Sequence, residues 1–234
     1  MRQVMNIASR EFRDYFISPI AYIVISIFLL VTGWFFFTTF FLYNQADLRS
    51  FFKLLPPTLS FVIPAITMRL FSEERNVGSY ETLLTLPVTF RDIILGKFLA
   101  AVLLVSVMLV PTIFYAFCIS TIGALDWGPV IGGYLGAVLL GAAFCAIGLF
   151  ASSLTRNQII AFIVAMAICF TLTTIDRMLF FFPQSTLPVL GYLGAGSHFQ
   201  NIARGIIDSR DIIYFLSVVF VGLYCTALVM EEKN

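Results

Sequence analysis

The sequence predicts an all-α membrane protein, with six transmembrane helices in a single domain that covers residues 1–234. Apolar residues make up 60% of the chain and charged residues only 12%, roughly half the charged share of soluble domains. The charges gather in clusters between uncharged runs, and several runs approach or exceed the roughly 20 residues that cross a bilayer core. Because so few charges cannot solvate a globular surface, lipid is expected to cover much of this chain.

The uncharged runs and their flanks define the predicted spans. The second span contains Pro56, Pro57 and Pro64 and is expected to bend, since neighbouring groups in a membrane can satisfy the freed carbonyls. Both termini are predicted to be cytoplasmic, because most Lys and Arg residues then lie on the inner side. The spans are expected at about 20–43, 52–71, 97–122, 129–153, 157–176 and 211–230.

A seventh uncharged run precedes the last span but is poorly built for a straight helix. It extends over 178–203 and contains Pro183 and Pro188, followed by Gly191, Gly194 and Gly196. We therefore expect a broken outer segment within 178–208 that re-enters the membrane from one side or lies on it.

The N-terminal residues 1–18 are predicted to form an amphipathic interfacial helix. On a helical projection the apolar side chains share one side and the polar ones the other, with Glu11 alone out of place. This pattern is typical of a helix that lies in the plane of the membrane surface. Pro19 then marks the turn into the first span. The helix is either a passive anchor or a docking element for a cytoplasmic partner. In the second case Arg10, Glu11 and Arg13 form a secondary partner interface.

The stretch 72–96 holds the densest cluster of charges and is predicted to be a cytoplasmic loop with its own helices. Ser79 can cap a short helix that Pro87 ends. Thr89 and Asp92 have the spacing of a capping box, which starts a second helix leading into the third span. The apolar face of the short helix either lies on the membrane surface or enters a groove on a soluble partner.

This loop carries a family resemblance. Its sequence from Glu73 to Val88, EERNVGSYETLLTLPV, resembles the loop after the second span in ABC-2-type permeases, where the pattern is E-[KR]-x-x-G-[ST]-x-E-x-L-L-x-x-P-[VI]. In that family the short helix is a coupling helix that sits in a cleft of the ATP-binding subunit. The resemblance implies a partner interface formed by Glu73, Glu74, Arg75, Gly78, Tyr80, Glu81, Leu83, Leu84 and Pro87.

A second stretch, 197–214, resembles the outer segment of one branch of that family. The branch includes permeases associated with gliding motility and with the maturation of nitrous oxide reductase. Ser197, His198 and Phe199 belong to this segment. A Ser next to the single His is compatible with a hydrolase. However, two adjacent residues do not by themselves bring a nucleophile, a base and an orienting group together. We therefore expect His198 to form hydrogen bonds within the outer segment, and we predict no catalytic residue and no metal site.

The sequence contains no G-x-x-x-x-G-K-[ST] phosphate loop, so ATP hydrolysis is expected on another chain. The resemblance implies a permease subunit, more consistent with export than import, in the bacterial cytoplasmic (inner) membrane. The implied partners are two copies of an ATP-binding subunit, which hold ATP and Mg²⁺, and a second permease chain, the same or related. Membrane lipid surrounds the chain and no nucleic acid is expected. The alternative is a stand-alone channel or membrane scaffold without an ATPase partner.

Overall fold

The structure is a computed structural model that describes residues 2–43, 47–77, 89–123, 125–178, 183 and 187–232, and the regular elements in these residues are all helical. They are α1 (Arg2–Ile17), α2 (Ile20–Tyr43), α3 (Arg49–Thr67), α4 (Arg69–Val77), α6 (Phe90–Leu109), the 3₁₀ turn η1 (Val110–Thr112), α7 (Ile113–Ile122), α8 (Trp127–Leu154), α9 (Gln158–Met178), α10 (Leu187–Leu193), α11 (Ala195–Ala203) and α12 (Ser209–Glu232).

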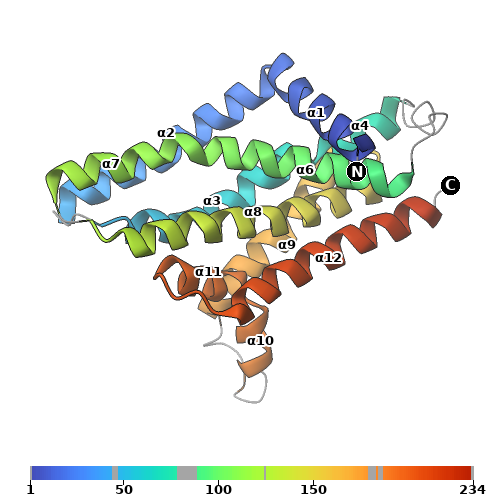
Figure 1. Cartoon of the computed structure of the whole chain (residues 1–234). Helices are drawn as coiled ribbons and strands as arrows, with labels where there is room; N and C mark the ends of the chain where they lie inside the picture. The colour runs from blue at the N-terminus through green and yellow to red at the C-terminus, as the bar shows by residue number, and fades with distance from the viewer. Residues whose placement is uncertain are drawn as a thin grey trace.

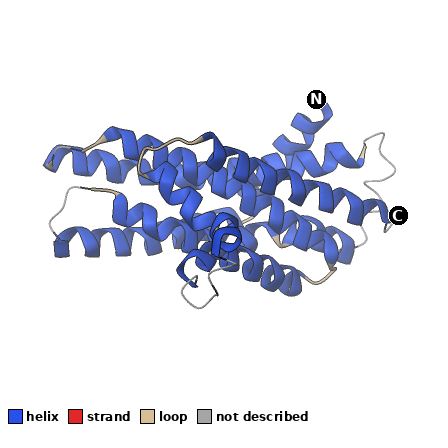
Figure 2. Ribbon diagram, turned by 90° about the horizontal axis from the view of Figure 1, so that it is seen from below, coloured by secondary structure: helices blue, strands red, loops and turns tan. Residues whose placement is uncertain are grey.

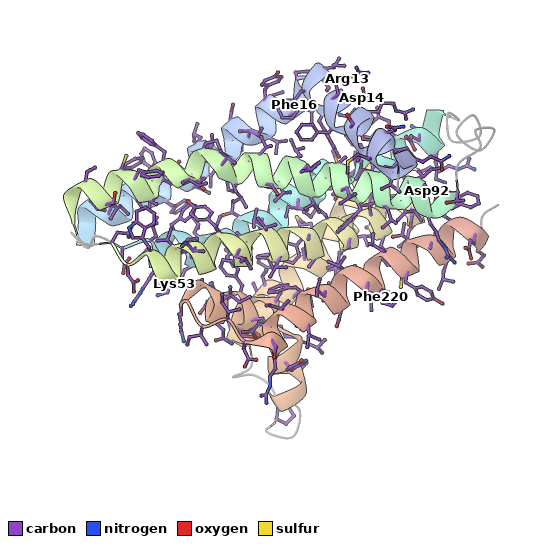
Figure 3. The ribbon with its side chains drawn as sticks, in the orientation of Figure 1. Arg13, Asp14, Phe16, Lys53, Asp92 and Phe220 are labelled. Atoms are coloured by element: carbon purple, nitrogen blue, oxygen red, sulfur yellow. The ribbon has the colours of Figure 1, made fainter. Side chains whose placement is uncertain are left out.

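The described residues contain six helical stretches long and apolar enough to cross a membrane. The stretches are Ile20–Thr38, Arg49–Asn76, Phe90–Thr121, Trp127–Leu154, Gln158–Met178 and Ser209–Glu232. This confirms the predicted all-α membrane class and its six spans. Large apolar side chains cover the outside of these helices, as at Phe220, which is 70% exposed on α12 and points away from the bundle (Figure 3). Such a surface suits lipid rather than water.

The helices form a bundle around α8, which packs against α3, α6, α9, α11 and α12 (Figure 1). Both ends of the chain lie at one end of the bundle, together with α4 and the start of α6. We call this the terminal end. The C-terminal end of α2 and the start of α3 lie at the opposite end, and Figure 3 shows Lys53 there, far from Asp92. A view from below shows the same elongated arrangement (Figure 2).

Glycines let the other helices approach α8 closely. A Cβ at Gly133 would overlap the ring of Phe52 on α3, and one at Gly141 would lie 2.8 Å from Val105 on α6. A Cβ at Gly132 would overlap the carbonyl of Ile202 on α11. These glycines of α8 therefore serve packing within the chain, as small residues do at helix contacts in membranes.

Helix α1 lies across the terminal end and meets α2 at a sharp bend (Figure 1). The bend falls at Ser18 and Pro19, where the sequence predicts the turn into the first span. The apolar face of α1 packs along α6, and Ala8 and Tyr15 are buried there. Arg13 and Asp14 are exposed on the same helix. The amphipathic pattern is thus explained at least in part by protein packing, while contact of α1 with a membrane surface remains a prediction.

The run before the last span is broken, as its prolines and glycines predict. α10 and α11 are short, and Gly205, which follows them, has φ 85°, a backbone conformation that suits glycine. α11 packs on α8, α9 and α3, with His198, Phe199 and Ile202 buried. Re-entry of this segment into the membrane stays a prediction.

Candidate functional site

The predicted coupling loop falls partly outside the described residues. Gly78, Tyr80, Glu81, Leu83, Leu84 and Pro87 all lie in the stretch 78–88, which the structure does not describe. The flanks of this stretch are described. The predicted loop begins at residue 72, but residues 72–77 are helical and belong to α4. On the other flank, the capping box predicted at Thr89 and Asp92 is present and starts α6.

The first flank, α4, is separated from α3 by a one-residue break at Met68. Ser152 of α8 spans this break. Its Oγ accepts hydrogen bonds from the backbone N–H groups of Phe71 (3.0 Å) and Ser72 (3.1 Å) and donates to the carbonyl of Met68 (2.8 Å). The first N–H groups of a helix have no partner within it, so Ser152 caps α4 from a neighbouring helix.

Glu73, Glu74 and Arg75, predicted to contact a partner, all have partners within the chain. Glu73 pairs with Arg69 one turn earlier, at 2.9 Å between Oε2 and Nε. Arg75 donates from Nη1 to the carbonyl of Ser153 at the end of α8, at 2.6 Å. Glu74 pairs with Lys97, at 2.6 Å between Oε1 and Nζ. Glu74 and Arg75 therefore tie α4 to α6 and α8.

Lys97 is the centre of an ion cluster that the sequence analysis did not single out. The residue is only 1% exposed, and its Nζ lies 3.0 Å from Glu11 Oε1 on α1 as well as 2.6 Å from Glu74. It also lies 5.6 Å from the ring centroid of Phe71 on α4. The signal was present: Glu11 is the one polar residue on the apolar side of α1, and Lys97 sits at the head of an apolar run. Lys and Glu are almost never fully buried unless they are paired, so a Glu on an apolar face and a Lys at an apolar run together favour a buried pair.

A cavity of about 320 Å³ lies beside this cluster, between α1, α4 and α6. Arg10, one of the predicted secondary contacts, lines it and pairs weakly with Glu11 at 3.4 Å, whereas Arg13 is exposed on α1. Tyr15 is buried at the edge of the cavity, and burial raises the pKa of its phenol above the ordinary value. The lining residues are Arg10, Glu11, Asp14, Tyr15, Ser18, Arg69, Leu70, Glu73, Glu74 and Lys97.

His198 is held by hydrogen bonds on both ring nitrogens, as the bonding role predicted for it requires. Nδ1 lies 2.5 Å from Asp211 Oδ1 on α12, and Nε2 lies 2.9 Å from the carbonyl of Tyr192 on α10. The ring stacks on Tyr214 with centroids 4.2 Å apart. These contacts close the α10–α11 segment onto the start of the last span.

The neighbours of His198 are used for packing and hydrogen bonds in the same segment. The Ser197 hydroxyl donates to the carbonyl of Gly194 at 3.0 Å, and its backbone N–H donates to Asp176 Oδ2 at 2.6 Å. Phe199 is fully buried against Gly136 of α8. Ser197 and His198 thus point to different partners and form no nucleophile–base pair. Within the described ranges, no group of three or more His, Cys, Asp or Glu side chains could hold a metal ion.

Comparison with known proteins identifies the family. The family described as "ABC-2 family transporter protein" matches residues 5–230, nearly the whole chain. The chain belongs to this family. No curated protein matches the chain. As an ABC-2 family protein, the chain is a membrane-spanning permease subunit of an ABC transporter and is not itself catalytic. Permeases of this family generally work with an ATP-binding subunit, so the terminal end, where α4 and α6 flank the stretch 78–88, becomes the candidate site of that contact.

Proposed function

We propose that this permease is the membrane part of an exporter driven by ATP hydrolysis on a separate ATP-binding subunit, which docks on the 73–88 loop. The family membership supports a transport subunit, and the missing phosphate loop supports a separate ATPase. The narrower branch, with gliding-motility and nitrous-oxide-reductase-maturation permeases, belongs to the same proposal and rests on the 197–214 stretch.

The observation that carries this proposal is the anchoring of both flanks of the loop. Arg75 fastens α4 to the end of α8, and Lys97 fastens α6 to α4. A force on the loop would therefore reach α8, the helix around which the bundle packs. Rigid elements joined in this way move as bodies between two arrangements, which is the switch that alternating access requires.

The proposed assembly holds two ATP-binding subunits, with ATP and Mg²⁺ bound on those chains, and two permease chains, the same or related. It lies in the bacterial cytoplasmic membrane with both termini and the loop on the cytoplasmic side. In the loop, Glu81 supplies a charge at the partner interface, while Tyr80, Leu83 and Leu84 enter the cleft of the ATP-binding subunit.

The test is co-purification in mild detergent from the membranes of the host, followed by measurement of ATP hydrolysis. An ATP-binding subunit should accompany the wild-type chain. Glu81→Lys and Leu83→Asp should each abolish the stimulated hydrolysis while the variant stays inserted in the membrane. Lys53→Glu, a charge reversal at the opposite end of the bundle, is the matched control and should leave hydrolysis unchanged.

Two results would count against the proposal. If both loop variants still stimulate ATP hydrolysis as the wild type does, the loop does not couple the permease to the ATP-binding subunit. A chain that purifies alone, with no ATP-binding subunit, would favour the stand-alone channel or scaffold.

A further inference from the structure

We propose that Lys97 is a positioning residue that links helix α1 to the two flanks of the 78–88 stretch, so that α1 takes part in coupling instead of serving only as an anchor. This inference rests on the proposed function, because it concerns how the loop transmits the action of the ATP-binding subunit. It is carried by the geometry of three side chains: Glu11, Glu74 and Lys97.

These three side chains come from three different helices. Glu74 lies on α4, which leads into the stretch 78–88, and Lys97 lies on α6, which leads out of it. Glu11 lies on α1, far from both in sequence. One ammonium group contacts both carboxylates, at 2.6 Å and 3.0 Å, and the side-chain exposures are 2% for Lys97, 18% for Glu74 and 13% for Glu11. Charges this deeply buried interact strongly, because little water screens them.

The backbone packing around the cluster divides these helices into two groups. α1 packs along α6, and their approach is closest beside the cluster, where a Cβ on Gly96 would lie 2.6 Å from Ile7 Cγ2. α4 instead packs on α8, α9 and α3, and α6 also contacts α8. The contacts of Lys97 with Glu74 and with Phe71 add a direct side-chain link between α4 and the pair of α1 and α6.

This arrangement assigns a mechanical role to α1. When α4 moves with the loop, Lys97 carries the displacement into α6, and Glu11 carries it into α1. Since Lys97 is 1% exposed, it is too deeply buried to contact a docked subunit directly and acts through its two carboxylates. Glu11, predicted from the sequence as a secondary partner contact, then acts within the chain.

The experiment uses the permease co-purified with its ATP-binding subunit. Lys97→Met removes the charge but keeps the length of the side chain, and Glu11→Gln removes the other end of the link. In both variants the ATP-binding subunit should still co-purify, while stimulated hydrolysis per bound subunit falls about fivefold or more, the lower bound of typical coupling between sites. Lys97→Arg should retain most of the stimulation, and Lys53→Met, an exposed lysine at the opposite end, should retain all of it.

The double variant separates transmission from direct contact. If Glu11 acts through Lys97, then Lys97→Met with Glu11→Gln should be no worse than Lys97→Met alone, because the link is already broken. If the double variant instead shows the product of the two single-variant losses, Glu11 acts on the partner surface independently of Lys97, and the inference is overturned. Wild-type stimulation in both single variants would also overturn it while leaving the proposed function intact. If Lys97→Met fails to insert, Glu11→Gln, on a helix outside the spans, still tests the inference, because wild-type stimulation in that variant would overturn it.

A wild-type preparation without any ATP-binding subunit would overturn the proposed function, and this inference with it. Co-purification of the wild-type chain therefore tests the proposed function first, and the variants then test the inference about Lys97.

Discussion

Replacing Ser152 with alanine tests whether α8 holds the break between α3 and α4. The hydroxyl of Ser152 accepts from the backbone N–H groups of Phe71 and Ser72, and these donors are buried. Alanine removes the acceptor but leaves both donors in place. The carbonyl of Met68 keeps a partner, because the Ser72 hydroxyl also donates to it. The loss is therefore confined to two N–H groups.

The expected magnitude follows from these two groups. A buried donor left without a partner costs about 1–3 kcal/mol, and hydrogen bonds between membrane helices are worth about 0.6 kcal/mol on average, so relaxation will recover part of the loss. We expect Ser152→Ala to lower the free energy of unfolding by about 2–4 kcal/mol, taken as two donors at 1–2 kcal/mol each. Unfolding of the purified permease in mixed detergent micelles, followed by circular dichroism, measures this difference.

Ser217→Ala is the matched control. The Ser217 hydroxyl is exposed and donates to the carbonyl of Ile213 in its own helix at 2.7 Å, so its removal should change the free energy of unfolding by less than about 0.5 kcal/mol. Equal and small effects of the two substitutions would refute the view that Ser152 caps α4 across the helix contact.

Two further substitutions test the packing of α8 and the burial of α1. Gly148→Ala should destabilise the fold by about 3 kcal/mol, because the new methyl group would lie 2.7 Å from the Cβ of Thr67 and overlap its hydroxyl. Gly128→Ala meets nothing closer than 3.4 Å and should be near neutral in the same unfolding assay. Tyr15→Phe should leave stability at pH 7 unchanged or higher, since the buried hydroxyl has no hydrogen-bond partner among the described residues. Burial raises the pKa of Tyr15 above 10, so the folded state keeps the phenol proton while the unfolded state loses it, and the wild type should lose stability as the pH rises above 10. That loss should shrink in Tyr15→Phe and persist in Tyr22→Phe, whose ring is exposed; an identical pH profile for all three proteins would contradict the burial of Tyr15.

Local signals predicted the elements that depend on local chemistry. The capping box of Thr89 and Asp92 was readable from spacing alone and is present at the start of α6. Pro19 marked the bend between α1 and α2, and Pro and Gly marked the broken run before the last span. Each of these features acts within a few residues, so one sequence suffices to see it.

The partners of buried charges depend on contacts between distant segments, and these were missed. Glu74 and Arg75 matched a family pattern, yet nothing in that pattern indicates that Lys97 and the carbonyl of Ser153 would be their partners. The pairing of His198 with Asp211 across α11 and α12 was likewise not predicted. In both places the residue type predicts a hydrogen bond, and only the packing of the helices selected the partner.

The sequence by itself determined that this chain resides in lipid and crosses it six times, because each charged residue adds its own free-energy cost of insertion into hydrocarbon. Long uncharged runs can therefore be recognised from the sequence alone. The sequence also predicts that the loop after the second span contacts an ATP-binding subunit, and this stays a prediction because the structure describes the flanks of the loop but not residues 78–88. The tertiary structure decided how the flanks of that loop are held. Glycines on α8 set how closely the helices approach, and that approach brings Glu11, Glu74 and Lys97 to one point. Burial then makes their charges interact strongly, which neither residue type nor spacing could reveal.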